Sequence, residues 1–327
     1  MKRIFSLIAV TLITFTAATA QRISVVTEDG TTSIFRTIQE AIEGADPGSI
    51  IYLPGGGFSL PDSVKITKKL TIIGIGHKSD NENADGSTII SGNVFFNQGS
   101  SGSAVMACYI TGDVNIGEGG ATVNDVTIKF CNLNSVQVKN SACQETVVNQ
   151  CYMRGESNFG QSPNVTIENN VINRIVEVGS GFIRNNVLTY SNYLVVYGSG
   201  NTLSNVNNSV ISGNIIRLAK GYIHSGNGCA ADNNLVIGGS WGENPVLIEA
   251  TEDECFDNLN GWAVTPVSRF HFKGDYSQYE HQVGIYAGDG FNEDQLAPVP
   301  YIISKDIPQQ TDAAGKLNIK IRVKAGD

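Results

Sequence analysis

A short motif, a strand followed by an asparagine and a second strand, recurs along the chain and limits its possible folds. It reads "VTIENNVINR" at residues 165–174, "FIRNNVLTY" at 182–190, "VISGNIIRL" at 210–218 and "AADNNLVIGG" at 230–239. Apolar residues around it alternate with a period of two, which is typical of strands, and helical periodicity is missing from these segments. The Asn-Gly and Asp-Gly pairs that would mark a hairpin at each interval are also missing.

Aligning the motif gives a column of polar or thiol-bearing residues, with intervals of 16 to 28 residues between successive members. Such irregular intervals suit the turns of a solenoid whose loops differ in length. In a parallel coil each strand pairs with its counterpart one turn later, so the aligned residues stack and bond as an asparagine ladder. The predicted ladder residues are Cys108, Cys131, Cys151, Asn170, Asn186, Asn214 and Asn234.

The predicted fold class is all-β, a single-stranded right-handed parallel β-helix with an N-terminal cap helix and a C-terminal β cap. Right-handedness is expected because parallel crossovers have that hand. We expect a signal peptide over residues 1–20, because Lys2 and Arg3 precede an apolar run and a small-residue cleavage site after Ala20. The β-helix is predicted over 21–265 and a cap or tail with a β-hairpin over 266–327.

The mature chain is expected to be exported, to the extracellular space, the cell surface or the periplasm, without a transmembrane segment. Its 20 basic and 31 acidic residues give a net charge of −11. An acidic chain without a basic run is unsuited to nucleic acid, which requires clustered Lys and Arg. The oligomeric state is left open.

Six cysteines in an exported protein usually suggest disulfides. Three of them occupy the ladder column and are interpreted as structural thiols, because a small, weakly polar thiol can replace asparagine there. Cys143, Cys229 and Cys255 lie off the column, and a bridge between Cys229 and Cys255 is left open. No Cys or His spacing indicates a zinc site.

The segment "FRTIQEAIEGADPGSIIYLPGGGFSL", residues 35–60, predicts a helix with Ile38, Ala41 and Ile42 on one apolar face. Together with "KLTIIGIG" at 69–76, this segment resembles the N-terminal cap and first strand of the pectate-lyase-like right-handed β-helix superfamily. The resemblance implies a capped β-helix and an action on acidic polysaccharides, as a lyase, hydrolase or esterase. None of the catalytic constellations of those enzymes can be placed on this sequence residue by residue.

The C-terminal residues Leu317, Ile319, Ile321 and Val323 alternate with polar residues, which predicts a half-buried strand paired with 301–307. This hairpin is interpreted as a cap, and a surface-attachment or export signal is the alternative. No cofactor is predicted, although the acidic loops 80–85 and 252–257 leave calcium open. The G-x-S-x-G match at 238–242 is interpreted as a glycine-rich turn, because Pro245 prevents the helix that a nucleophile needs.

If the apolar members of the Val-x-Val triplets point inward, their middle residues, among them Asn115, point outward and form a polar and aromatic stripe. Such mixtures bind glycans, because amides bond hydroxyls and aromatic rings stack on sugars. The predicted ligand-binding residues are Gln137, Asn158, Glu177, Tyr193, Tyr197 and Glu249.

Within this stripe, the side chains best able to donate or accept a proton during catalysis form one cluster. These candidate catalytic residues are Arg217, Lys220, Tyr222 and His224. The leading hypothesis is an exported protein that interacts with a polysaccharide, without a recognisable catalytic signature. An active polysaccharide lyase or hydrolase and a structural or adhesive surface protein are the alternatives.

Overall fold

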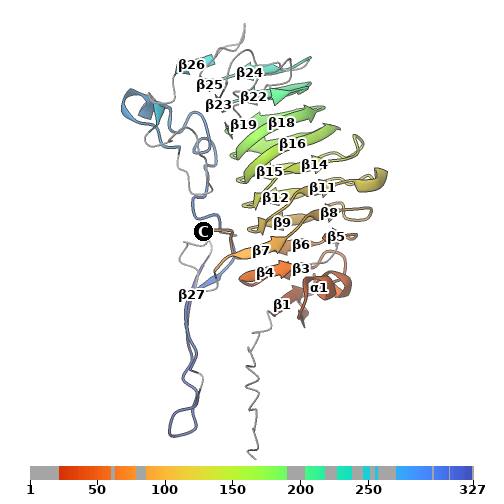
Figure 1. The fold of residues 1–327 in the computed structure, drawn as a ribbon, viewed down its shortest axis with the longest axis vertical. Coiled ribbons are helices and arrows are strands. Elements are labelled where there is room, and N and C mark those ends of the chain that lie inside the picture. Colours follow the sequence, from red (N-terminus) through yellow and green to blue (C-terminus); the bar gives the residue numbers. More distant parts are fainter. Residues whose placement is uncertain are drawn as a thin grey trace, which may run out of the picture.

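The computed structural model is nearly all β-structure and forms a parallel β-solenoid of about 8 turns (Figure 1). This confirms the predicted fold class. For residues 246–250 the structure describes the backbone alone. The described residues are 22–59, 63–78, 86–189, 203–217, 227–237, 246–250, 255–256, 270–296, 298–308 and 310–325.

Two long sheets run along the solenoid, and each coil contributes strands to both. In sheet A, β1 is antiparallel to both of its neighbours, and the strands from β3 onward are parallel to one another. The strand order is β2-β1-β3-β6-β9-β12-β15-β17-β19-β22-β24. Its strands are β1 (Ile23–Val26), β2 (Thr32–Phe35), β3 (Ile50–Tyr52), β6 (Thr71–Ile73), β9 (Ala104–Met106), β12 (Thr127–Lys129), β15 (Val147–Asn149), β17 (Val165–Glu168), β19 (Gly181–Arg184), β22 (Ser209–Ser212) and β24 (Ala230–Asp232).

Sheet B has two parts within each coil, separated by a turn in most coils and joined in the long strands β16 and β18. Its first part comprises β4 (Gly56–Ser59), β7 (Thr88–Ser91), β10 (Tyr109–Ile110), β13 (Asn132–Leu133), β16 (Tyr152–Ser162), β18 (Val171–Val178), β20 (Val187–Leu188), β23 (Ile215–Arg217), β25 (Asn234–Ile237) and β26 (Val246–Ala250). The second part adds β5 (Val64–Ile66), β8 (Val94–Phe96), β11 (Val114–Ile116), β14 (Val136–Val138) and β21 (Leu203–Ser204).

A sharp bend joins sheet A to sheet B in each coil, and the aligned residues follow it directly. The residue before each of them has a left-handed backbone, with φ between 50° and 65°. That conformation costs roughly 1–2 kcal/mol for a residue other than glycine, and asparagine tolerates it best. The bend residues are Ala107, Phe130, Gln150, Asn169, Asn185, Gly213 and Asn233.

The asparagines after the bend form a continuous column of hydrogen bonds inside the solenoid. The Oδ1 atom of Asn186 accepts from both the backbone N and the Nδ2 of Asn170, at 3.0 and 2.9 Å. Asn214 receives the same pair of bonds from Asn186, and Asn234 receives them from Asn214. All four side chains are fully buried, so each bond satisfies a polar group that water cannot reach.

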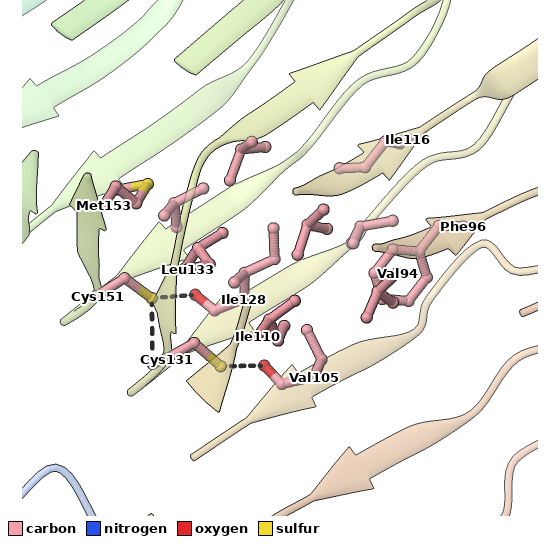
Figure 2. Close-up of a cluster of buried hydrophobic side chains, with 14 of the residues drawn as sticks. Val94, Phe96, Val105, Ile110, Ile116, Ile128, Cys131, Leu133, Cys151 and Met153 are labelled. Carbon is pink, nitrogen blue, oxygen red and sulfur yellow. Dashed lines mark hydrogen bonds between the residues drawn. The ribbon is translucent and has the colours of Figure 1, made fainter. Parts of the chain in front are cut away.

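Thiols continue the column in the earlier coils, as Figure 2 shows. Cys151 N donates to Asn170 Oδ1 at 2.8 Å, whereas Cys131 N reaches Cys151 Sγ at 3.5 Å. The Sγ atoms of Cys131 and Cys151 donate to the carbonyl oxygens of Val105 and Ile128. Burial raises the pKa of the Cys151 thiol well above its usual value, so it remains protonated at neutral pH.

Apolar side chains fill the interior of the coils. Ile72, Val105, Ile128 and Val148 are in register on neighbouring strands of sheet A, and all are fully buried. Each such side chain contributes roughly 1.5–3 kcal/mol of burial free energy. Sheet B supplies the opposite wall through the buried Val and Ile of its short triplets.

A short helix, α1 (Ile38–Gly44), lies at the N-terminal end of the solenoid, next to β1, β2 and β5 (Figure 1). Thr37 and Glu40 form a capping box, each side chain accepting from the backbone N of the other. The predicted apolar face, comprising Ile38, Ala41 and Ile42, is buried. The helix therefore covers the open end of the core, as a cap must.

Residues 270–296, here called the strap, lie along the side of the coils and run back toward the N-terminal end (Figure 1). Gly284 N donates to Gly213 O, and Asn169 Nδ2 donates to the carbonyls of Ile285 and Ala287. Further along the strap, Asn292 N donates to Gln150 Oε1, and Gln295 bonds His77. This position differs from the expected closing cap.

The strap lies there because the outer face of sheet B is apolar in its later coils. Val171, Val187, Ile215 and Leu235 are in register and point outward, yet they are buried. The strap covers them and forms a second apolar cluster outside the coils; its own members are Phe270, Phe272, Val283 and Ile285. The strap includes a short 3₁₀ helix, η3 (Gly274–Tyr279), and a turn of the coils includes another, η1 (Glu118–Gly120).

After the strap, β27 (Tyr301–Asp306) and β28 (Lys320–Lys324) form an antiparallel hairpin. The sequence predicted this hairpin, but it predicted a half-buried strand, whereas the apolar side chains of β28 are exposed because no described residue packs on them. The hairpin projects past the N-terminal end of the coils in Figure 1, and every residue of β28 is exposed.

The six cysteines form no disulfide. The bridge left open between Cys229 and Cys255 is absent because the two residues belong to different clusters. Cys229 packs against the interior of the coils, whereas Cys255 packs in the cluster beneath the strap.

Replacing Asn186 by alanine should lower the free energy of unfolding by about 3 kcal/mol, because buried groups of Asn170 and Asn214 lose their partners. Urea denaturation followed by circular dichroism measures this change. Asn173→Ala is the matched control on β18, since the Asn173 side chain makes no hydrogen bond among the described residues and should cost about 0.5 kcal/mol or less. Equal losses in the two variants would contradict a stabilising role for the column.

Candidate functional site

Five outward residues on the second part of sheet B form a straight row, here called the outer row. Each is the middle residue of a short strand or occupies the equivalent position, and the strand pairing places them side by side. Neighbouring strands are about 4.8 Å apart, so the row presents one side chain at each step. Its members, in order, are Lys65, Phe95, Asn115, Gln137 and Asn158.

Asn115 lies in the middle of the row, between Phe95 and Gln137. Its side chain is only 6% exposed and has no hydrogen-bond partner among the described residues. The amide atoms of Asn115 are not among the fully buried unpaired atoms, so they retain some contact with solvent. They are therefore available to a ligand that reaches the row.

The other amides of the row are partly engaged, which fixes their orientation. Gln137 Nε2 donates to Ser135 Oγ and to Glu156 O, and Lys139 Nζ donates to Gln137 Oε1 at 3.5 Å. Asn158 Oδ1 accepts from Gly160 N, while no described group accepts from its Nδ2. The row is thus held in place and retains hydrogen-bonding capacity.

A second set of polar side chains lies beside the row, on the first part of sheet B. Arg154 Nη1 donates to Tyr109 Oη at 3.1 Å and to Asn132 Oδ1 at 3.3 Å. The guanidinium also lies 5.2 Å from the centre of the Tyr109 ring. These contacts fix an aromatic ring and a cation on the first part of sheet B.

The structure places two predicted ligand-binding residues, Gln137 and Asn158, next to each other in the row. Glu177 is displaced from it, because Val176 is the residue that pairs with Asn158. The displacement arises from a register shift in β16, which has more residues than β18 between their paired positions. The Glu177 carboxylate accepts instead from Gln161 and Asn205, each at 2.6 Å.

Most of the remaining predicted residues cannot be placed in the site. The backbone of Glu249 pairs with Val236 on the first part of sheet B, away from the row. Arg217 ends β23 and pairs with Ile237. Five predicted residues lie outside the described part of the chain: Tyr193, Tyr197, Lys220, Tyr222 and His224. The G-x-S-x-G match at 238–242 and most of the two acidic loops also lie outside it.

Sequence reasoning missed Lys65 and Phe95. Both are middle residues of triplets, "VKI" at 64–66 and "VFF" at 94–96, and these have the same pattern as "VNI" at 114–116. The triplet signal was therefore present, but it begins two coils before the ladder column, whose first member is Cys108.

A hollow of about 350 Å³ lies elsewhere, between the strap and the bends. Phe130, Gln150, Phe291 and Tyr301 contribute to its walls. The side-chain Oε1 atom of Gln150 already accepts a hydrogen bond from Asn292 N at 2.6 Å. The hollow results from the docking of the strap and is separate from the outer row.

Across the described residues, no group of three or more His, Cys, Asp or Glu side chains is arranged to hold a metal ion. None of the helices in that part of the chain has the length and apolar character needed to cross a bilayer. No family model, curated protein or solved structure matches the sequence.

Replacing Asn115 by valine should leave the free energy of unfolding unchanged or raise it by up to about 1 kcal/mol. The variant loses no hydrogen bond and gains a residue that favours strands. Asn170→Val is the matched control, because its amide has partners and its loss should destabilise the protein. Urea denaturation compares the two, and a loss above about 1 kcal/mol in Asn115→Val would show that this amide serves the fold.

Proposed function

We propose that this is an exported β-solenoid protein that binds a polysaccharide along the outer row. The observation that carries the proposal is the register of the row, in which an aromatic ring and three amides follow one another on adjacent strands. A regular row of this kind suits an extended polymer, whose repeating units offer hydroxyl groups at regular intervals. The fold-level resemblance to the pectate-lyase-like superfamily, and the predicted signal peptide, support the same function.

The chemistry of the row suits a sugar chain. Amide groups both donate and accept, as hydroxyl groups do, so Asn115 and Asn158 can bond a sugar through the atoms that lack partners. The ring of Phe95 is half-buried and can stack on the apolar face of a pyranose. Lys65 and Lys139 are exposed beside these groups and favour a polymer that carries carboxylates.

Binding is favoured over cleavage at this site. The outer row contains no carboxylate, whereas glycoside hydrolysis uses a pair of them across the scissile bond. The predicted catalytic residues Lys220 and His224 lie outside the described residues, and a lyase or hydrolase remains the alternative function. Release of reducing ends from a polymer incubated with the protein would favour that alternative.

Isothermal titration calorimetry of residues 21–327 with polygalacturonate, alginate and a neutral β-glucan tests the proposal. At least one polymer should bind, and Phe95→Ala or Gln137→Ala should weaken that binding about tenfold, or about 1.4 kcal/mol. Thr127→Ala is the matched control, because Thr127 is half-buried and points outward on sheet A. Its affinity should equal that of the unmodified protein.

Two results would contradict the proposal. One is the absence of heat from all three polymers. The other is binding that the outer-row variants and the sheet A control leave equally intact, which would place the ligand on a different surface.

A further inference from the structure

The C-terminal hairpin carries an apolar face that the described part of the chain does not cover. Eight large apolar side chains are highly exposed on the described residues, and five of them lie in this region. A two-stranded ribbon is only marginally stable in water unless another strand or surface packs on it. The five side chains, which are 45–59% exposed, are Ile307, Leu317, Ile319, Ile321 and Val323.

The hairpin is amphipathic because side chains alternate between its two faces. Ile319, Ile321 and Val323 share one face of β28, while Lys320 and Arg322 point to the other. The pairing places Ile302 opposite Val323, which extends the apolar face onto β27. On that same face Lys305 lies opposite Ile321, and on the other face Asp306 lies opposite Lys320. The hairpin therefore has one mainly apolar face that carries a single lysine, and one polar face on which basic residues outnumber acidic ones.

The net charge of the hairpin indicates which kind of surface it packs on. Residues 301–325 contain five basic and two acidic residues, a net charge of +3, whereas residues 22–300 contain 15 basic and 28 acidic residues, a net charge of −13. Two hairpins packed on each other would bring like charges together. A hairpin packed on the acidic solenoid brings opposite charges together and favours association.

The other three exposed apolar side chains are Ile34, Phe182 and Val210. Phe182 and Val210 pair in register on β19 and β22 and form an apolar patch on the outer face of sheet A, here called the Phe182–Val210 patch. Ala230 extends the patch on the next strand, and Asp232 adds an exposed carboxylate beside it. Arg184 lies 5.2 Å from the centre of the Phe182 ring, and its charge is paired with Glu168 at 3.0 Å. The patch therefore combines apolar surface with one acidic residue beyond that ion pair, which suits an apolar hairpin face bordered by basic residues.

The two surfaces are also of similar size. Strand β28 extends roughly 13 Å at about 3.3 Å per residue. The three strands that carry the patch, β19, β22 and β24, are about 10 Å across at about 4.8 Å per strand. Sheets that pack face to face bury stretches of such dimensions.

The hairpin cannot reach this patch on its own chain. It projects past the N-terminal end of the coils, whereas β19 and β22 lie toward the opposite end (Figure 1). We propose that the hairpin of one copy packs its apolar face on the Phe182–Val210 patch of a second copy. Because the hairpin and the patch are different surfaces, the contact is heterologous, and each added copy leaves one hairpin and one patch free.

Sedimentation equilibrium of residues 21–327, from about 1 to about 100 µM, tests the proposal. The average mass should rise continuously beyond that of a dimer, and Ile319→Asn combined with Ile321→Asn should weaken association at least tenfold. Asn318→Thr is the matched control on the opposite face of the hairpin and should associate like the unmodified protein. A monomer throughout this range would overturn the proposal.

A mixing experiment identifies the two surfaces. Phe182→Ser combined with Val210→Ser removes the patch, so this variant and the hairpin variant should each be monomeric alone. Mixed together they should form a one-to-one dimer that grows no further, because one variant keeps its hairpin and the other its patch. Self-association of the patch variant alone, or no dimer in the mixture, would overturn the proposal. Polysaccharide binding by the outer row is measured separately, so either proposal can fail without the other.

Discussion

Hydrogen bonds between side-chain amides of successive coils set the register on which the rest of this structure depends. Asn186, Asn214 and Asn234 each accept two bonds from the coil before them. Each also donates to a backbone carbonyl of that preceding coil; Asn186 Nδ2, for example, reaches Ile167 O at 2.9 Å. A slip of one residue between coils would break these bonds and turn every outward side chain inward. In the earlier coils, which carry the outer row, thiols occupy the column and the parallel strand pairing continues the same register.

The earlier and later coils of the solenoid differ in the residue type that forms the inner column and in the side chains on the outer face of sheet B. The earlier coils use thiols, whose contacts of about 3.5 Å are longer than the amide bonds of 2.8–3.0 Å. These coils carry the outer row. The later coils use asparagine, and their outer face on sheet B is the apolar stripe that the strap covers. The strap attaches through bend residues such as Asn169, so the bend serves both the turn and the docking of a distant segment.

Much of this fold could be predicted because its signal is periodic. The aligned asparagines and the Val-x-Val triplets predicted the coils, and Gln137 and Asn158 were expected to lie together for the same reason. Glu177 was misplaced because the register shift in β16 has no signature in the sequence. The position of the strap could not be predicted either, because the contact between Asn169 and Ile285 joins residues 116 positions apart without any repeat.

Hydrogen exchange of backbone amides, resolved by residue, tests the central claim most directly. The account predicts that the amides of Asn170, Asn186 and Asn214 exchange only when the whole solenoid unfolds, because their acceptors are buried side chains of the next coil. Exchange at these three amides as fast as at the exposed turn residues Gly119 and Gly120 would contradict it. That result would mean that the column does not hold the coils together.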